Sequence, residues 1–159
     1  MKELTLKSTI HVADFDELSQ QERELIEKAK AATYNSYAPY SHFHVGAAIL
    51  LQNGIVVPGC NQENAAFPSG LCAERSAIFA AGAQYPDQAV LMLAIAVRNS
   101  EGEFLAEPAS PCGSCRQVII ETETRFKQPV RILLYGTDHT YVMDGIKHLM
   151  PLSFTKIEQ

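Results

Sequence analysis

The chain has 159 residues, of which 47% are hydrophobic and 19% charged, and its formal net charge is −5. These values are typical of a globular protein with a substantial core, and we expect a single domain over residues 1–159. The 13 basic residues are scattered, which argues against a nucleic-acid partner, because nucleic acid needs a clustered basic face. No apolar run is long enough to span a membrane, so no membrane partner is expected.

The cysteine content bears on the cellular compartment. The four cysteines could form two disulfides in an oxidising compartment, but nothing else in the sequence indicates one. The N-terminal stretch Met1-Lys2-Glu3-Leu4-Thr5 lacks the apolar segment of a signal peptide. We therefore expect a cytoplasmic protein with reduced thiols.

The first segments of the chain are an arm and a helix. Residues 1–15 are expected to form an irregular arm that contains an edge strand from Leu4 to Val12. Ser19 and Glu22 have the spacing of a capping box, in which each side chain bonds the backbone of the other residue. Apolar residues recur behind them at helical intervals, which predicts a helix over about 20–35.

A hairpin and a second helix follow. The apolar runs 45–51 and 55–57 flank Asn53-Gly54, a dipeptide typical of the tight turn between two antiparallel strands. Pro68-Ser69-Gly70 then interrupts the chain, and a helix is predicted over about 71–83.

The rest of the chain alternates between strands and helices. The apolar run 90–97 predicts a strand covered on both faces. Ser110 is expected to cap a helix that has Pro111 at its first position and runs to about 124. The last predicted elements are a strand over 130–135, a short strand over 140–143 and a short helix over 144–149. The alternation predicts an α/β fold of three layers, α/β/α, with a mixed sheet of about five strands.

Three cysteines and one glutamate form the densest group of reactive side chains. They lie in two short segments, Cys72-Ala73-Glu74 and Pro111-Cys112-Gly113-Ser114-Cys115. A structural zinc has four protein ligands, whereas a catalytic zinc has three and leaves the fourth position to water. We therefore predict one catalytic zinc per chain, held by Cys72, Cys112 and Cys115. Glu74 is predicted to move protons between the activated water and the departing amine.

The charges around this group also carry a prediction. Cys72 and Cys112 each open a predicted helix, and the partial positive charge of a helix N-terminus stabilises thiolates. Three thiolates would leave a Zn²⁺ centre with a net negative charge, which weakens its ability to acidify water. Arg75 and Arg116 follow the ligands directly, and we expect at least one of them to donate a hydrogen bond to a ligand sulfur.

Simpler interpretations exist for parts of this pattern. A lone Cys-x-x-Cys also occurs in redox pairs and zinc knuckles. Cys60, at the end of the hairpin, is expected to be a small buried hydrophobe. His42 and His44 alternate near the start of the hairpin and could suggest a second metal pair, but no partner cluster accompanies them.

Four segments together resemble a known family, the small homotetrameric cytidine deaminases, over about residues 18–155. The segments are Tyr40-Ser41-His42-Phe43, Gly59-Cys60-Asn61-Gln62-Glu63-Asn64-Ala65, Cys72-Ala73-Glu74-Arg75 and Ser110-Pro111-Cys112-Gly113-Ser114-Cys115-Arg116-Gln117. The resemblance implies hydrolysis of cytidine and 2′-deoxycytidine to uridine and 2′-deoxyuridine in pyrimidine salvage. Ammonia is released after a zinc-bound hydroxide attacks C4, and Glu74 shuttles the protons.

The resemblance also implies roles for residues outside the metal site. Phe43 is similar to the aromatic residue that packs on the pyrimidine ring. Asn61 and Glu63 match the pair that hydrogen-bonds the ribose, chiefly its 3′-hydroxyl, and Ala73 matches a further substrate contact. Phe154 is similar to a C-terminal aromatic residue that reaches the site of a neighbouring subunit. A homotetramer with sites near its subunit interfaces is therefore expected.

Three positions depart from the family pattern. His44 stands where a Pro is common, Ala66 where a Cys is frequent and Phe67 where a Tyr is frequent. The change at Phe67 removes a hydroxyl, so a polar contact there is not expected in this chain. None of the three departures changes a predicted zinc ligand or the predicted proton carrier.

Other functions remain open on the sequence alone. Related enzymes act on other aminopyrimidines, such as antibiotic nucleosides of the blasticidin type, but the Asn61 and Glu63 pair argues against that substrate. A nucleotide deaminase would need a cationic phosphate pocket. A zinc-stabilised interaction module would need a fourth protein ligand and would not need Glu74. A thiol–disulfide oxidoreductase using Cys112 and Cys115 would leave Cys72 and Glu74 without a role.

Overall fold

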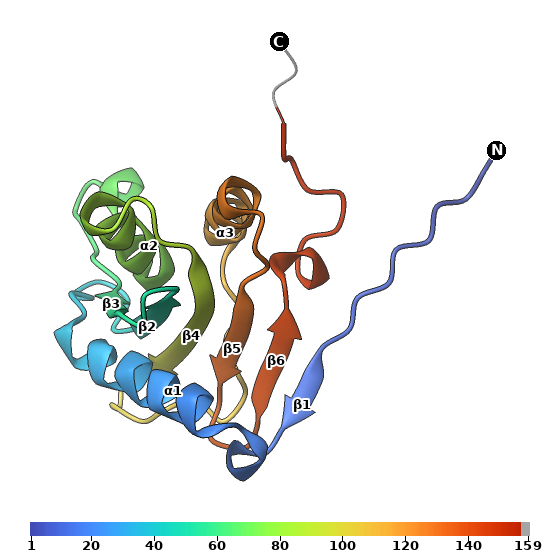
Figure 1. Cartoon of the computed structure of the whole chain (residues 1–159). Coiled ribbons are helices and arrows are strands. Elements are labelled where there is room, and N and C mark those ends of the chain that lie inside the picture. Colours follow the sequence, from blue (N-terminus) through green and yellow to red (C-terminus); the bar gives the residue numbers. More distant parts are fainter. Residues whose placement is uncertain (157–159) are drawn as a thin grey trace.

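A six-stranded sheet forms the middle layer of residues 1–156, the part of the chain that the computed structural model describes (Figure 1). The strand order is β1-β6-β5-β4-β2-β3, and every neighbouring pair is antiparallel except β4 and β5, which are parallel. The strands are β1 (His11–Ala13), β2 (His44–Leu51), β3 (Val56–Cys60), β4 (Val90–Arg98), β5 (Arg131–Tyr135) and β6 (Thr140–Asp144).

Helices cover both faces of this sheet. The α-helices are α1 (Gln20–Ala32), α2 (Ala73–Gln84) and α3 (Gly113–Phe126). Short 3₁₀ turns lie at Phe15–Glu17, Thr33–Asn35, Phe67–Ser69 and Ile146–His148. Figure 1 shows α1 on one side of the sheet and α2 and α3 on the other. None of the helices in residues 1–156 combines the length and the apolar character needed to cross a membrane.

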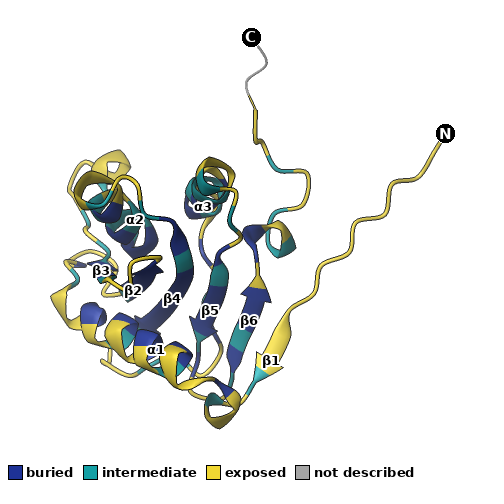
Figure 2. Ribbon diagram, in the orientation of Figure 1, coloured by how far each residue is buried: buried dark blue, intermediate teal, exposed yellow. Residues whose placement is uncertain are grey.

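Two hydrophobic cores result, one on each face of the sheet, and the alternation of strand side chains separates them. In β2, Ala47 and Ile49 pack in the core under α2 and α3, whereas Ala48 and Leu50 pack in the core under α1. The central strands are consequently buried on both faces (Figure 2). The predicted three-layer α/β/α class is therefore confirmed, with six strands in place of about five.

Two glycines let helices approach β2 and β3 more closely than any side chain would permit. A Cβ at Gly46 would lie 2.1 Å from the carbonyl oxygen of Ala29 in α1. A Cβ at Gly59 would lie 2.5 Å from both the Ala73 oxygen and the Ala77 nitrogen in α2. Gly59 therefore sets the position of the first turn of α2, where two of the predicted site residues are found.

The element boundaries correct several predictions. The edge strand is His11–Ala13, so only residues 11 and 12 of the predicted Leu4–Val12 strand are paired, and the strand ends one residue later than predicted. The cap of α3 is Cys112 and not Ser110, so the helix begins about two residues later than predicted. The predicted helix over 144–149 is a single 3₁₀ turn, Ile146–His148, and follows Gly145, whose φ is +98°. The capping box of Ser19 and Glu22 is confirmed.

Candidate metal centre and its pocket

Three cysteine sulfurs lie together where the first turns of α2 and α3 face each other. Cys72 is the N-cap of α2, Cys112 is the N-cap of α3, and Cys115 lies in the first turn of α3. Both caps have extended backbone, with ψ of 156° at Cys72 and 167° at Cys112. The sulfurs of the three residues all lie within 4.8 Å of one another. Two segments separated by strand β4 thus meet at one point.

This cluster fits zinc. In a tetrahedral site with Zn–S bonds of about 2.3 Å, two ligand sulfurs lie about 3.8 Å apart. The Sγ atoms of Cys72 and Cys112 are 3.7 Å apart. Free thiols are the appropriate donors, and the four cysteines of the chain form no disulfide in the structure. Among the described residues, Cys72, Cys112 and Cys115 are the group of metal-ligating side chains with this spacing.

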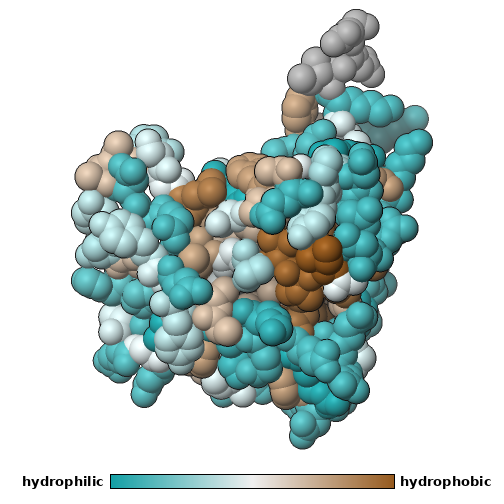
Figure 3. All heavy atoms as spheres, turned by 60° about the vertical axis from the view of Figure 1, so that its left-hand side comes forward, coloured by the Kyte–Doolittle hydropathy of each residue, from teal (hydrophilic) through white to brown (hydrophobic). Residues whose placement is uncertain are grey.

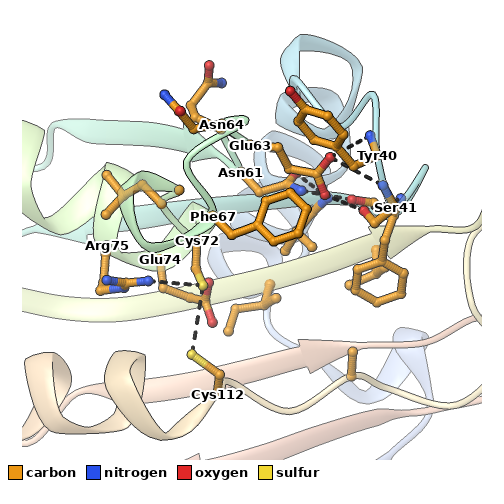
Figure 4. Close-up of a pocket in the computed structure, with 18 of the residues that line it drawn as sticks. Tyr40, Ser41, Asn61, Glu63, Asn64, Phe67, Cys72, Glu74, Arg75 and Cys112 are labelled. Carbon is orange, nitrogen blue, oxygen red and sulfur yellow. Dashed lines mark hydrogen bonds between the residues drawn. The ribbon is translucent and has the colours of Figure 1, made fainter.

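Glu74 brings a carboxyl group to the same point. Its side chain is buried, with 4% of the residue exposed, and it lines the pocket beside Cys72 and Cys112 (Figure 4). Burial raises the pKa of Glu74 above that of an ordinary carboxyl group, and the charge of the neighbouring Cys72 acts in the same direction. A carboxyl group held in this way takes up and releases a proton closer to neutral pH.

Of the two predicted arginines, one contacts a ligand sulfur and the other does not. The Nη2 of Arg75 donates to the Sγ of Cys72 at 3.3 Å (Figure 4). Arg116 donates to two backbone carbonyls, that of Pro111 at 2.8 Å and that of Leu149 at 2.6 Å. Arg116 therefore holds the segment that enters α3, because it bonds the carbonyl of Pro111, the residue before Cys112.

The thiols of the cluster interact strongly with one another. Hydrogen bonding from Cys115, with a further bond from Arg75, lowers the pKa of Cys72 to about 5. The bond to Cys72 and burial raise the pKa of Cys115. The opposite shifts favour a thiolate at Cys72 and a thiol at Cys115, and a dication bound between the two sulfurs would displace the thiol proton.

A pocket of about 760 Å³ opens beside the cluster. Its walls combine the metal-binding corner with apolar side chains and a group of polar loop residues. The lining comprises Tyr40, Ser41, Phe43, Val45, Asn61, Gln62, Glu63, Asn64, Phe67, Gly70, Leu71, Cys72, Glu74, Arg75, Ile95, Val97, Ala109, Ser110 and Cys112. Such a volume is in the usual range for small-molecule sites.

The two predicted sugar contacts line the pocket and also hold its loops. The Asn61 amide accepts from the Val45 N–H at 2.8 Å and donates to the Phe43 carbonyl at 2.8 Å. The Glu63 carboxylate accepts from the backbone N–H groups of Tyr40 and Ser41 and from the Ser41 hydroxyl. These bonds, that from the Ser41 hydroxyl first, hold the pKa of Glu63 below its ordinary value. Asn61 keeps a second N–H, and each oxygen of Glu63 keeps acceptor capacity.

Two predicted substrate contacts lie outside this pocket. Ala73 is fully buried, its carbonyl oxygen lies against Gly59, and it is not among the residues that line the pocket. Phe154 is 63% exposed on the C-terminal segment, and its carbonyl accepts from the Gln117 side chain at 2.9 Å.

The remaining cysteine and the two histidines have local roles. Cys60 is half-buried rather than buried, because its sulfur bonds the Asn35 carbonyl and receives a bond from Gln62. His44 Nδ1 lies 2.7 Å from the Ser36 hydroxyl, and His42 has a left-handed backbone with φ of +54°. Within residues 1–156, neither histidine lies close enough to the three cysteines to share a metal ion with them.

Several pocket residues had no predicted role, and two of them hold the loops of the pocket. Ser41 holds Glu63, and Tyr40 packs edge to face against Phe67 at 5.6 Å between ring centroids (Figure 4). Ser41 precedes His42, whose left-handed backbone marks a tightly held loop. That conformation cannot be read from the residue type, so the residue types alone carried no signal for these loop contacts.

A family comparison agrees with this geometry. Residues 19–128 match the model of the cytidine and deoxycytidylate deaminase zinc-binding region. A cytidine deaminase of Sporosarcina psychrophila is 46% identical over 99 residues, which cover 62% of this chain and 67% of the relative. A cytidine deaminase of Mycobacterium tuberculosis is 40% identical over 106 residues, which cover 65% of this chain and 74% of the relative.

Solved structures show the same likeness. The crystal structure of cytidine deaminase from Burkholderia pseudomallei aligns with a TM-score of 0.71 and 36% identity, and the alignment covers 86% of this chain and all of the other. The structure of cytidine deaminase from Mycobacterium tuberculosis aligns with a TM-score of 0.64 and 33% identity over 82% of this chain and 94% of the other.

Proposed function

This chain belongs to the cytidine and deoxycytidylate deaminase family, and from that premise we propose that it is a zinc-dependent cytidine deaminase. It converts cytidine and 2′-deoxycytidine, with one water, to uridine and 2′-deoxyuridine, and releases ammonia. The bond that breaks joins C4 of the base to its exocyclic nitrogen, and the bond that forms joins C4 to the oxygen of water.

One observation carries this proposal. A buried carboxyl group, that of Glu74, lies at a cluster of three thiols on the wall of a pocket that is large enough for a nucleoside. A structural zinc would need a fourth protein ligand, whereas three thiols leave one position for water. Zinc bound by Cys72, Cys112 and Cys115 would supply Lewis-acid activation of that water.

The chain itself supplies the proton chemistry. Glu74 is buried and has a raised pKa, so it holds a proton more readily than an exposed carboxylate. We assign to it the removal of a proton from water and its delivery to the departing amine. Arg75 is a positioning residue, since its bond to the Cys72 sulfur withdraws charge from the thiolate and leaves the centre more electrophilic.

The other end of the pocket would hold the nucleoside. We assign packing on the pyrimidine to Phe43, which lines the pocket and is partly exposed, and Val45, Ile95 and Val97 would add apolar surface that excludes water. Asn61 and Glu63 would bond the ribose hydroxyls with the capacity that their loop contacts leave. Because cytidine and 2′-deoxycytidine share the 3′-hydroxyl, a site that binds this group accepts both nucleosides.

The charge of the pocket favours a nucleoside over a nucleotide. Among the described residues that line it, Arg75 is the basic one, and its Nη2 is committed to the Cys72 sulfur. A phosphate group would need one or more uncommitted cations. The carboxylate of Glu63 at the loop end would repel a phosphate.

Assembly and compartment are further parts of the proposal. Large apolar side chains are exposed on the single chain, including Phe79 and Phe154, and apolar residues gather in a patch on the face shown in Figure 3. Such patches are typical of association surfaces. We propose a homotetramer in which Phe154 reaches a neighbouring pocket. Three free thiols at a zinc site also favour the reducing cytoplasm.

The experiment that tests the function combines a spectrum with a metal determination. Purified protein is incubated with cytidine, the ultraviolet band of cytidine and the released ammonia are followed, and zinc is quantified in the same sample. We expect loss of the band with equimolar ammonia and about one zinc per chain. One zinc without turnover would instead favour the structural module, and insulin reduction without zinc would favour the oxidoreductase.

A further inference from the structure

The N-terminal arm is an extended segment that the rest of the chain leaves uncovered. Its apolar residues alternate with polar ones, so that Leu4, Leu6, Ile10 and Val12 share one face of an extended strand. Leu4 is 71% exposed and Val12 is 63% exposed. In Figure 1 the arm leaves the sheet beyond β1 and runs away from the domain.

The paired part of the arm shows how its backbone is oriented. His11–Ala13 pairs with β6, and the Thr9 N–H donates to His148 Nδ1 at 3.1 Å. In an antiparallel strand, backbone groups of alternate residues point to the same side. Odd-numbered residues therefore direct their N–H and C=O groups toward β6 and its continuation. The even-numbered residues direct theirs to the open edge of the sheet, at which β1 is the last strand.

The two edges of the sheet differ in their protection. The opposite edge strand, β3, contains Pro58, which cannot donate a ladder hydrogen bond and is typical of a protected edge. Residues 4–13 contain no proline, and Lys7 is the one charged residue among them apart from the titratable His11. An exposed edge strand with alternating apolar residues, no proline and a single lysine is a template for pairing with another strand.

The sequence of the arm is complementary to itself. If Ser8 pairs with Ser8 of a second, antiparallel copy, Leu4 lies opposite Val12 and Leu6 lies opposite Ile10. The same register brings Lys2 beside Asp14 at each end, so opposite charges meet. A shift by two residues in either direction places a polar or charged residue opposite two of the four apolar residues.

We propose that the arm is a dimerisation strand, which pairs antiparallel with the arm of a second copy of this chain about Ser8 and joins the two sheets at their β1 edges. The strand lies before the segment that matches the family, residues 19–128, and none of its residues lines the pocket. The contact is therefore separate from the site that carries deamination.

Disulfide trapping in the full-length, zinc-loaded protein tests the register. Residues that pair through backbone hydrogen bonds have Cα atoms about 5.5 Å apart, which is within the range of a disulfide. Ser8→Cys should therefore form a covalent dimer in oxidised glutathione. Thr5→Cys is the matched control, since it is an exposed residue of the same arm whose copies would lie about 20 Å apart in this register.

A pair of charged substitutions at positions 6 and 10 separates loss of pairing from loss of folding. In the Ser8→Cys background, Leu6→Glu or Ile10→Lys alone should lower the dimer yield several-fold, and the two together should restore it, because position 6 faces position 10. Cytidine turnover should be equal in all variants, which shows that each is folded. An absent Ser8→Cys dimer, an equal yield from Thr5→Cys, or no restoration in the double variant would overturn the proposal.

Discussion

The two ends of the pocket are built from different kinds of structure. The thiol end consists of Cys72, Glu74 and Cys112, which are placed by the starts of two helices on a buried sheet. Cys115, which is 0% exposed, completes the sulfur cluster there. The loop end consists of the segments around Tyr40 and Phe67, which lie at the surface. Chemistry that requires fixed geometry thus rests on regular elements, and recognition rests on loops held by a few hydrogen bonds.

This difference predicts that substitutions at the thiol end act on turnover and those at the loop end act on affinity. The largest effect is expected from Cys115→Ser. Loss of a buried ligand should remove zinc and reduce deamination to background, with a lower melting temperature. Zinc content and turnover measured together test this. Cys60→Ser is the matched control, because Cys60 bonds only loop groups in the structure, and it should keep both.

Glu74→Gln should have the next largest effect. Gln preserves the size of the buried side chain but cannot exchange a proton, so kcat should fall by about 10²–10⁴-fold. The zinc content should stay at that of the parent protein. Steady-state kinetics and metal analysis would contradict the assignment if zinc were lost with activity, since Glu74 would then act as a ligand. Glu121→Gln, at an exposed position of α3, is the control.

Arg75→Gln should have a smaller effect at the same end. The variant removes the cationic bond to the Cys72 sulfur, and loss of such a partner costs about 10–100-fold in metal affinity or activity. Zinc affinity measured by competition with a chelator and kcat measured at saturating zinc would separate the two. Arg125→Gln, whose guanidinium bonds the Pro86 carbonyl, should leave both unchanged.

At the loop end, Glu63→Gln should raise KM by about tenfold with a smaller change in kcat, consistent with the loss of one charged hydrogen bond. The assignment also predicts that the parent protein prefers cytidine over 3′-deoxycytidine and that the variant loses this preference. Ser41→Ala separates this role from support of the loop, because Ser41 bonds Glu63 without a predicted sugar contact. If Ser41→Ala abolished the preference equally, Glu63 would act through the loop alone.

The smallest effect is expected from Glu22→Gln in α1, away from the pocket, where the substitution should change only the pH dependence of stability. Burial alone would raise the pKa of Glu22, but bonds from Ser19 and Arg131 together hold it below its ordinary value. The folded chain therefore binds this proton less tightly than the unfolded chain. The resulting stability is present above the unfolded pKa of about 4.3 and is lost as pH falls through the folded value. The melting temperature should therefore fall less between neutral and acidic pH in Glu22→Gln than in the parent protein, as thermal melts at several pH values would show.

The comparison also explains what the sequence could predict. The cysteines and Glu74 were predicted because a zinc site requires particular residue types, and the start of a helix can be read from its flanking residues. Arg75 and Arg116 were equivalent in the sequence, but only Arg75 points to a sulfur. The difference depends on where Leu149 lies, which is a tertiary contact. The loop residues could be named only through the family resemblance.

Element existence was likewise easier to predict than element ends. The hairpin around Asn53-Gly54 and the buried strands followed from alternation and apolar runs. The start of α3 was misplaced because Ser110 and Pro111 are good capping residues, although the chain stays extended to Cys112. The arm was predicted as a longer strand since its alternation is real, but only three residues have a partner in the same chain.

The parallel pairing of β4 and β5 has a consequence for the order of folding. Parallel neighbours cannot be joined by a tight turn, so residues 99–130 must cross over the sheet before the two strands meet. Cys112 and Cys115 lie inside this crossover, whereas Cys72 precedes β4. Contacts that close such long loops form slowly. We expect that the full set of thiols assembles late in refolding, so that zinc uptake reports the final step and not the first collapse.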